Sequence, residues 1–140
     1  MAKLCSQMSG RPMARASESN GGVTMRVARI YTGEDGESHF GQLELSYTEM
    51  VDRVVPVMGA AKGVEFRRSP AGSFFDWHQA PTRMYMVTLV GRVEFGVSGG
   101  ETRIFEVGDV LLAEDVSGNG HTTRAIGEWV RIAVALPPTT

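Results

Sequence analysis

Two histidines and one aspartate have the types and the spacing needed for proton chemistry. Asp76 and His78 are separated by one residue in a segment, 73–78, that we expect to be a strand, and His121 follows a glycine-rich stretch. Side chains alternate between the two faces of a strand, so Asp76 is expected to share the face of His78. An imidazole exchanges protons near neutral pH and a neighbouring carboxylate can orient it, which makes both residues candidates for acid–base catalysis.

The segments around these residues are patterned as β-structure. Residues 92–97 alternate polar and apolar, 98–100 (Ser-Gly-Gly) form a hairpin turn, and 110–113 are an apolar run typical of a strand buried on both faces. Further strands are expected at 27–31, 40–47, 64–68, 83–90, 102–105 and 129–136. Short strands separated by turns, with almost no helical periodicity, predict an all-β domain, either a sandwich or a barrel.

The stretch from Gly108 to His121 resembles the second motif of the cupin family, in which Gly-Asp and a hydrophobic run precede a glycine and a histidine. In this chain the loop is two residues longer than usual, and Glu114-Asp115 stand where prolines are common. The first cupin motif has two histidines one residue apart, then a glutamate and a glycine. Here Asp76-Trp77-His78 and Gly91 follow that pattern, with Met84 at the glutamate position. The resemblance covers roughly residues 60 to 137 and implies a jelly-roll β-barrel.

The resemblance also implies that His78 points into the barrel and that His121 faces it. With Asp76 they would make two histidines and one carboxylate, a ligand set of open non-haem iron sites, so a divalent metal (Fe, Mn, Ni or Zn) is one hypothesis. Met84 in place of the glutamate argues that a four-ligand cage has been lost. The favoured hypothesis is therefore a pocket without a cofactor, in which the two histidines transfer protons.

If His78 points inward, other pocket-lining residues follow from its position. Phe74 and Ala80 would share its face, and we expect substrate contacts from both and from Met84, Met86, Thr88 and Thr123. Such a wall suits a mostly apolar organic ligand. Glu114 and Asp115 are expected in a solvated loop, His39 is a weak candidate for the site, and Trp77 and Trp129 are expected at packing interfaces.

Composition limits the partners of the protein. The chain has 140 residues and a formal net charge of −2, so an electrostatic nucleic-acid binder is not expected. No apolar stretch approaches the ~20 residues of a membrane span, so no membrane partner is expected either. Cys5 is the one cysteine, which fits a cytoplasmic protein. We expect a flexible arm over 1–24, a single domain over 25–140, and a homodimer that covers the open sheet edges.

Three functions remain open at this point. The first is an enzyme of isomerase, cyclase, dehydratase or epimerase type that acts on a small organic molecule by acid–base chemistry without a metal. The second is a metal-dependent oxygenase or lyase that uses Asp76, His78 and His121. The third is a non-catalytic binding protein with the same pocket. The fold cannot choose among them, because one fold hosts many functions.

Overall fold

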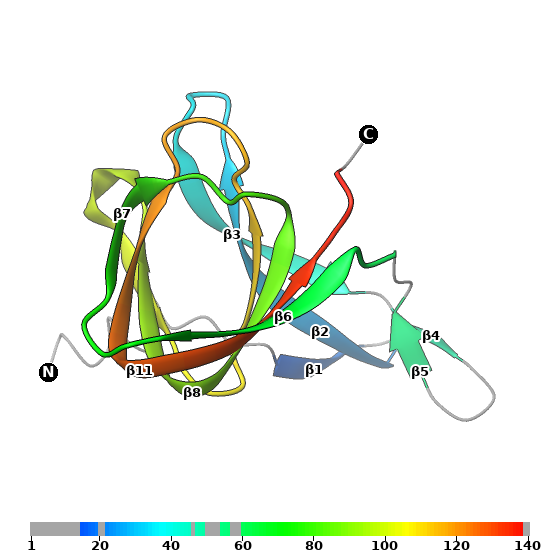
Figure 1. The fold of residues 1–140 in the computed structure, drawn as a ribbon. Coiled ribbons are helices and arrows are strands. Elements are labelled where there is room, and N and C mark those ends of the chain that lie inside the picture. The colour runs from blue at the N-terminus through cyan, green and yellow to red at the C-terminus, as the bar shows by residue number, and fades with distance from the viewer. Residues whose placement is uncertain (1–14, 20–21, 46, 50–53, 57–59, 139–140) are drawn as a thin grey trace, which may run out of the picture.

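The protein is all-β, as predicted. The computed structural model describes residues 15–19, 22–45, 47–49, 54–56 and 60–138, with side chains described for 26–45 and 60–138. A nine-stranded sheet accounts for most of the described residues, and a two-stranded hairpin stands beside it (Figure 1). The strands are β1 (Arg15–Ser19), β2 (Gly22–Thr32), β3 (Ser38–Leu45), β4 (Tyr47–Glu49), β5 (Val54–Pro56), β6 (Gly63–Ser69), β7 (Phe74–His78), β8 (Met84–Gly96), β9 (Thr102–Phe105), β10 (Val110–Glu114) and β11 (His121–Ala135).

The large sheet has the order β1-β2-β10-β8-β11-β6, with β3 added to β2, β7 to β11 and β9 to β8. Strands β2 and β10 run parallel, and every other pairing among the described strands is antiparallel. The sheet curls so that β7, β8, β10 and β11 surround a common interior (Figure 1). The pairings of the described strands do not run all the way round, so the sheet is not a closed barrel.

Strands β8 and β11 are longer than the sequence pattern predicts. The pattern indicates separate strands at 83–90 and 92–97, and only the 129–136 part of β11 as a strand. Both strands instead continue through glycines, Gly91 and Gly127, that have positive φ. The β8–β11 register shifts between Ile126 and Val130, opposite Gly91, where a Cβ would overlap the Glu128 carbonyl oxygen. The two strands therefore turn one corner together without ending.

Aromatic side chains fill the interior beside this corner. Phe95 is 1% exposed and packs edge-on against Phe105 and Trp129, with ring centroids 5.3 and 6.0 Å away. Trp129 donates its Nε1–H to the hydroxyl of Thr88 at 3.1 Å. Trp129 is thus a core residue, as expected of an aromatic at a packing interface, whereas Trp77 is 51% exposed.

Part of the predicted N-terminal arm is strand. Residues 15–19 form β1, which pairs with the start of β2 from Gly22 to Arg26, while 1–14 and 20–21 lie outside the described residues. Within the described part of the chain, no helix has the length and apolar character needed to cross a membrane.

Candidate functional site

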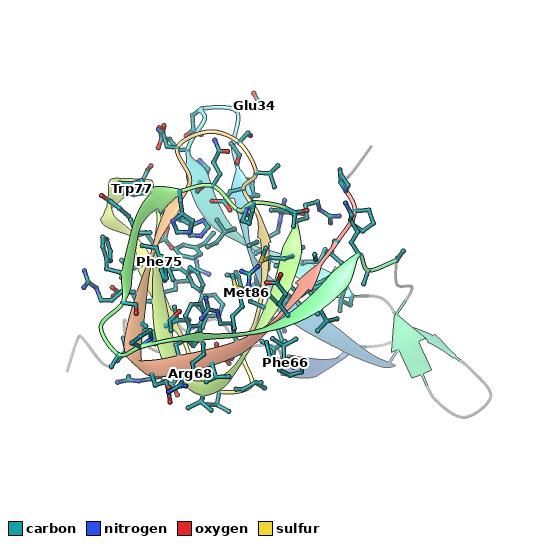
Figure 2. The ribbon with its side chains drawn as sticks, in the orientation of Figure 1. Glu34, Phe66, Arg68, Phe75, Trp77 and Met86 are labelled. Carbon is teal, nitrogen blue, oxygen red and sulfur yellow. The ribbon has the colours of Figure 1, made fainter. Side chains whose placement is uncertain are left out.

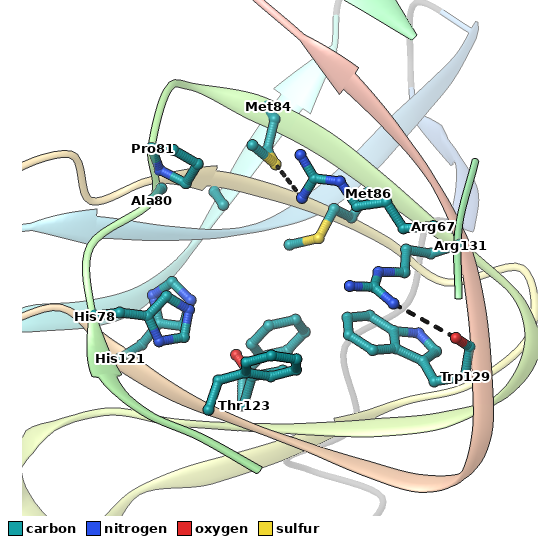
Figure 3. Close-up of a pocket in the computed structure, with 13 residues that line it drawn as sticks. Arg67, His78, Ala80, Pro81, Met84, Met86, His121, Thr123, Trp129 and Arg131 are labelled. Carbon is teal, nitrogen blue, oxygen red and sulfur yellow. Dashed lines mark hydrogen bonds between the residues drawn. The ribbon is translucent and has the colours of Figure 1, made fainter. Parts of the chain in front are cut away.

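A cavity of about 220 Å³ lies inside the curled sheet, bounded by side chains from β6, β7, β8, β10 and β11 (Figure 3). Its polar groups gather at two ends, with His78 and His121 at one and Arg67 and Arg131 at the other (Figure 3). Thr123 lies in the wall between them. The rest of the lining is apolar: Phe75, Ala80, Pro81, Met84, Met86, Phe95, Ala113 and Trp129.

The two histidines are register partners across β7 and β11. Their ring centroids are 4.6 Å apart with 59° between the ring planes, and His121 is 2% exposed. Gly120 allows this approach, because it has a φ of 79° and a Cβ there would overlap the His78 backbone. The glycine before His121 therefore brings the two strands close enough for the rings to touch.

His121 is held from behind by a buried hydrogen-bond chain. Its Nδ1 lies 2.6 Å from Oδ2 of Asp115, and the hydroxyl of Ser38 donates to the same oxygen at 2.6 Å. Asp115 is 0% exposed and Ser38 is 1% exposed. A carboxylate that accepts from both groups fixes the orientation of the imidazole.

His78 is oriented by the backbone. Its Nδ1 lies 2.7 Å from the carbonyl oxygen of Asp76. A carbonyl oxygen only accepts, so Nδ1 of His78 carries a proton, and in the neutral ring Nε2 does not. The carboxylate of Asp115 assigns the same tautomer to neutral His121. Neither Nε2 bonds to a described residue, so both rings offer a lone pair for a proton or a metal ion.

The expectation that Asp76 and Phe74 share the face of His78 was wrong. His78 pairs with His121 and Phe75 pairs with Thr123, so β7 has one more residue than β11 over this interval. This bulge reverses the alternation, and Phe75, rather than Phe74 or Asp76, lines the cavity with His78. Phe74 is 47% exposed and stacks under the guanidinium of Arg124. The carboxylate of exposed Asp76 accepts the backbone N–H of Trp77 at 2.9 Å.

Most of the other predicted contacts do line the cavity. Ala80, Met84, Met86 and Thr123 are among its walls, and Figure 2 shows Met86 pointing into the interior. Thr88 does not line it, because its hydroxyl accepts from Trp129 and its side chain is buried in the core. These placements establish geometry, and the roles of the residues in binding or catalysis stay predictions.

The predicted solvated loop at 114–115 is more structured than expected. Glu114 accepts from Arg29 of β2 and from Arg83, the residue before β8, whereas Asp115 is fully buried behind His121. Asp115 therefore occupies the orienting position that the sequence pattern assigned to Asp76. His39, the weak candidate, bonds to exposed Asp35 at 3.1 Å and is absent from the cavity lining.

Arg131, a buried cation at the far end of the cavity, was not predicted from the sequence. Arg131 is 8% exposed, its guanidinium lies 3.9 Å from the centroid of the Trp129 ring, and its Nη1 donates to Ser69 at 2.7 Å. Burial, and then the charge of Arg67, lower the pKa of Arg131 to about 10, so the group is still a cation at neutral pH. The sequence does contain an indication of this position. Arg131 lies midway between Trp129 and Ala133, and strand alternation places all three side chains on the same, inward face.

A metal site with two histidines and one carboxylate is not assembled from the residues that the structure describes, among which no three histidine, cysteine, aspartate or glutamate side chains converge. The nearest carboxylate to the pair, that of Asp115, is already engaged with His121 Nδ1. The two Nε2 atoms are the donors that a metal ion would find here, and they fit a weakly held ion better than a closed site.

Comparison with known proteins gives no family name, since no family model and no curated protein matches this chain. The resemblance to cupins therefore rests on the motif residues alone. We infer the function from the cavity and the groups that line it.

Proposed function

We propose that the cavity binds a small organic molecule and that His78 and His121 transfer protons to and from it. The buried chain from Ser38 through Asp115 to His121, which ends at the cavity, carries this proposal. A histidine kept only for packing does not need a fully buried carboxylate and a hydroxyl to orient its ring. Burial of a carboxylate costs free energy that hydrogen bonds and pairing only partly offset, so such a chain indicates a role in the fold or in a reaction.

The chemistry follows from the tautomers. Neutral His121 can accept a proton at Nε2, and Asp115 at Nδ1 stabilises the imidazolium that forms. His78, in ring contact with His121, can give a proton to a different atom of the same ligand if its ring enters the reaction protonated at Nε2, and it is then left neutral. Two such groups inside an apolar wall suit isomerisation, epimerisation, dehydration or cyclisation, none of which requires a cofactor.

Hydrogen–deuterium exchange tests the proposal with simple probe compounds in place of the natural substrate. Small carbonyl compounds with acidic C–H bonds are incubated with the protein in D2O, and deuterium incorporation is followed by proton NMR. We expect catalysed exchange that falls by about 10²–10⁴-fold in His121→Asn and in His78→Asn. His39→Asn is the matched control, because His39 bonds to an exposed aspartate outside the cavity. Equal exchange in wild type and His121→Asn would overturn the proposal, and binding without exchange would favour the non-catalytic alternative.

A metal-dependent reaction is the second candidate. It is favoured by one observation: each histidine engages Nδ1 with a protein oxygen and leaves Nε2 free, the arrangement of metal-binding histidines. Such an ion would be a Lewis acid, with His78 and His121 as its protein ligands. We expect EDTA-treated protein to retain its deuterium exchange. Loss of exchange with EDTA and recovery with one equivalent of Fe(II), Mn(II), Ni(II) or Zn(II) would establish the metal-dependent alternative instead.

The finer fold, a cupin-type jelly-roll barrel, belongs to the same proposal. It is supported by the curled sheet, by the corner that β8 and β11 turn together, and by a cavity on the inner face. The cupin-like motif from Gly108 to His121 spans β10 and ends at the first residue of β11, beside His78. An experimental structure in which these strands form two separate flat sheets would overturn this part of the proposal.

A further inference from the structure

Two arginines stand directly opposite each other at the end of the cavity away from the histidines. Arg67 of β6 and Arg131 of β11 are register partners in an antiparallel pair, and both line the cavity (Figure 3). Like charges in directly opposed positions of neighbouring strands repel each other. The repulsion reaches Arg131, whose pKa is lowered by burial first and by the charge of Arg67 second.

Arg131 has no acidic partner among the residues that the structure describes. Its Nη1 donates to the hydroxyl of Ser69 at 2.7 Å and lies 3.5 Å from the carbonyl oxygen of Trp129, both neutral acceptors. Its Nε–H is buried without an acceptor in the described part of the chain. A buried guanidinium normally has a carboxylate partner, because an uncompensated charge inside a protein is strongly destabilising.

Arg67 cannot supply that compensation and has little of its own. Its Nε donates to Glu65 at 2.7 Å, but the Glu65 side chain is 66% exposed, and an ion pair in contact with water contributes little. Its Nη1 lies 3.9 Å from the sulfur of Met84, on the cavity wall. Apart from the largely exposed Glu65, no carboxylate of the described residues pairs with either arginine, and none pairs with Arg131.

We propose that the cavity is selective for a small organic carboxylate, whose anionic group binds between Arg131 and Arg67. The guanidinium fork matches the planar geometry of a carboxylate. The apolar body of the ligand would lie along Met86 and Phe95, with its far end at His78 and His121. The cavity of about 220 Å³ is smaller than the roughly 300–1,000 Å³ of drug-sized sites, which favours a compact ligand. The chemistry at the far end rests on the proposed function, whereas the anion site does not.

Calorimetry with matched ligand pairs tests the anion site. The probes are benzoate and phenylacetate, their neutral amides benzamide and phenylacetamide, and inorganic phosphate. We expect the carboxylates to bind wild type at least tenfold more tightly than the amides, and this preference to vanish in Arg131→Met. Arg68→Met is the matched control, because Arg68 is the next residue on β6, is 76% exposed and lies on the outside of the sheet (Figure 2). It should keep the full preference.

Stability measurements separate a binding role from a structural one. Exchange of an unpaired buried cation for an apolar side chain should leave the thermal midpoint of Arg131→Met equal to or above that of wild type. If this variant does not fold, Arg67→Met should still lower carboxylate affinity at least threefold. Equal affinity for carboxylates and amides, an unchanged preference in Arg67→Met, or phosphate binding as tight as that of carboxylates would each overturn the assignment.

The proposed function and the anion site can fail separately. His121→Asn should keep the carboxylate preference while losing deuterium exchange. Carboxylate binding without exchange in wild type would remove the catalytic proposal and leave the anion site standing. Exchange into neutral carbonyl compounds, with no preference for carboxylates, would remove the anion site and leave the catalytic proposal standing.

Discussion

Asp115 is a carboxylate with no exposed surface, and its two oxygens have different surroundings. Oδ2 accepts from Ser38 and lies against His121 Nδ1, whereas Oδ1 has no hydrogen-bond partner among the described residues. A buried carboxylate in this position keeps the proton of the neutral imidazole on Nδ1. The other ring nitrogen, Nε2, is then without a proton. The residue therefore sets which atom of His121 faces the cavity.

The first prediction concerns that tautomer. Asp115→Asn keeps the shape of the side chain but removes the charge that holds the proton on His121 Nδ1. We expect the His121 tautomer to change in long-range proton–nitrogen NMR spectra, and deuterium exchange to fall by roughly 10²–10⁴-fold. Asp76→Asn is the control, since the exposed Asp76 side chain bonds, within the described residues, to the adjacent backbone N–H of Trp77 alone. If Asp76→Asn lowered exchange more than Asp115→Asn did, the role given to Asp115 would be wrong.

The second prediction concerns Ser38. Ser38→Ala removes a hydroxyl that donates to the buried Asp115 carboxylate at 2.6 Å. We expect a loss of about 1–3 kcal/mol in the free energy of unfolding, measured by urea denaturation, because the carboxylate loses a donor that water cannot replace. Ser73→Ala removes an exposed hydrogen bond to Pro70 and should cost less than about 0.5 kcal/mol. Equal losses in the two variants would show that Asp115 does not depend on Ser38.

Sequence predicted the two histidines of the site but placed the carboxylate wrongly. The spacing of Asp76 and His78 suggested a shared face, and strand alternation is a sound rule until a bulge interrupts it. The signal for Asp115 was present in the same rule. Leu111, Ala113 and Asp115 follow one another at alternate positions, and the first two are buried in the core. An acidic residue that continues an inward-facing apolar row is therefore the better candidate.

At the scale of elements, the strands β7 and β11 bring the histidines together through a glycine and a bulge. Neither feature changes the hydrophobic pattern of the sequence. The presence of the strands could therefore be predicted, but not which face of the sheet each side chain lies on. The long strands β8 and β11 illustrate the same limit. A glycine within an alternating strand pattern suggests that the strand ends there. In this protein Gly91 and Gly127 instead mark bends at which β8 and β11 continue.

The third prediction concerns Gly120, which has a φ of 79°. A Cβ at this position would overlap the His78 carbonyl, so Gly120→Ala should push β7 away from β11. Gly99→Ala is the control for backbone strain, because Gly99 has a φ of 86° but nothing within 4 Å of the added carbon. We expect Gly99→Ala to cost about 1–2 kcal/mol of unfolding free energy. Gly120→Ala should lower the free energy of unfolding clearly more than Gly99→Ala does in the same urea titration. Equal losses in the two variants would contradict a close approach of β7 and β11.

At the scale of the whole molecule, the outer face of β6 has apolar side chains in contact with water. Phe66 is 73% exposed (Figure 2) and Val64 is 56% exposed. Strand alternation places both on the face opposite to Arg67. Among the described strands, β6 pairs with β11 alone, so its other edge is open. An open edge beside exposed apolar side chains is a surface at which a second copy could add.

The fourth prediction is therefore a homodimer. Sedimentation at micromolar concentration should give about twice the 15.2 kDa of the chain. Phe66→Asp should give the monomer mass, because a charge placed on this face would be buried without a partner in the dimer. Val116→Asp, at another exposed apolar position, should leave the dimer intact. A wild-type mass of one chain would refute the prediction.

The parallel pairing of β2 with β10 affects how the protein is made. Arg29 of β2 and Glu114 at the end of β10 hydrogen-bond to each other and are 85 residues apart in the chain. A ribosome adds roughly 5–20 residues per second, so β2 waits about 4–17 s for its neighbour to be synthesised. During that interval the β2–β3 hairpin can form, yet the β2 edge that later receives β10 has no strand to pair with. The newly made chain is most exposed to aggregation, and most in need of a chaperone, in this window before residue 114 emerges.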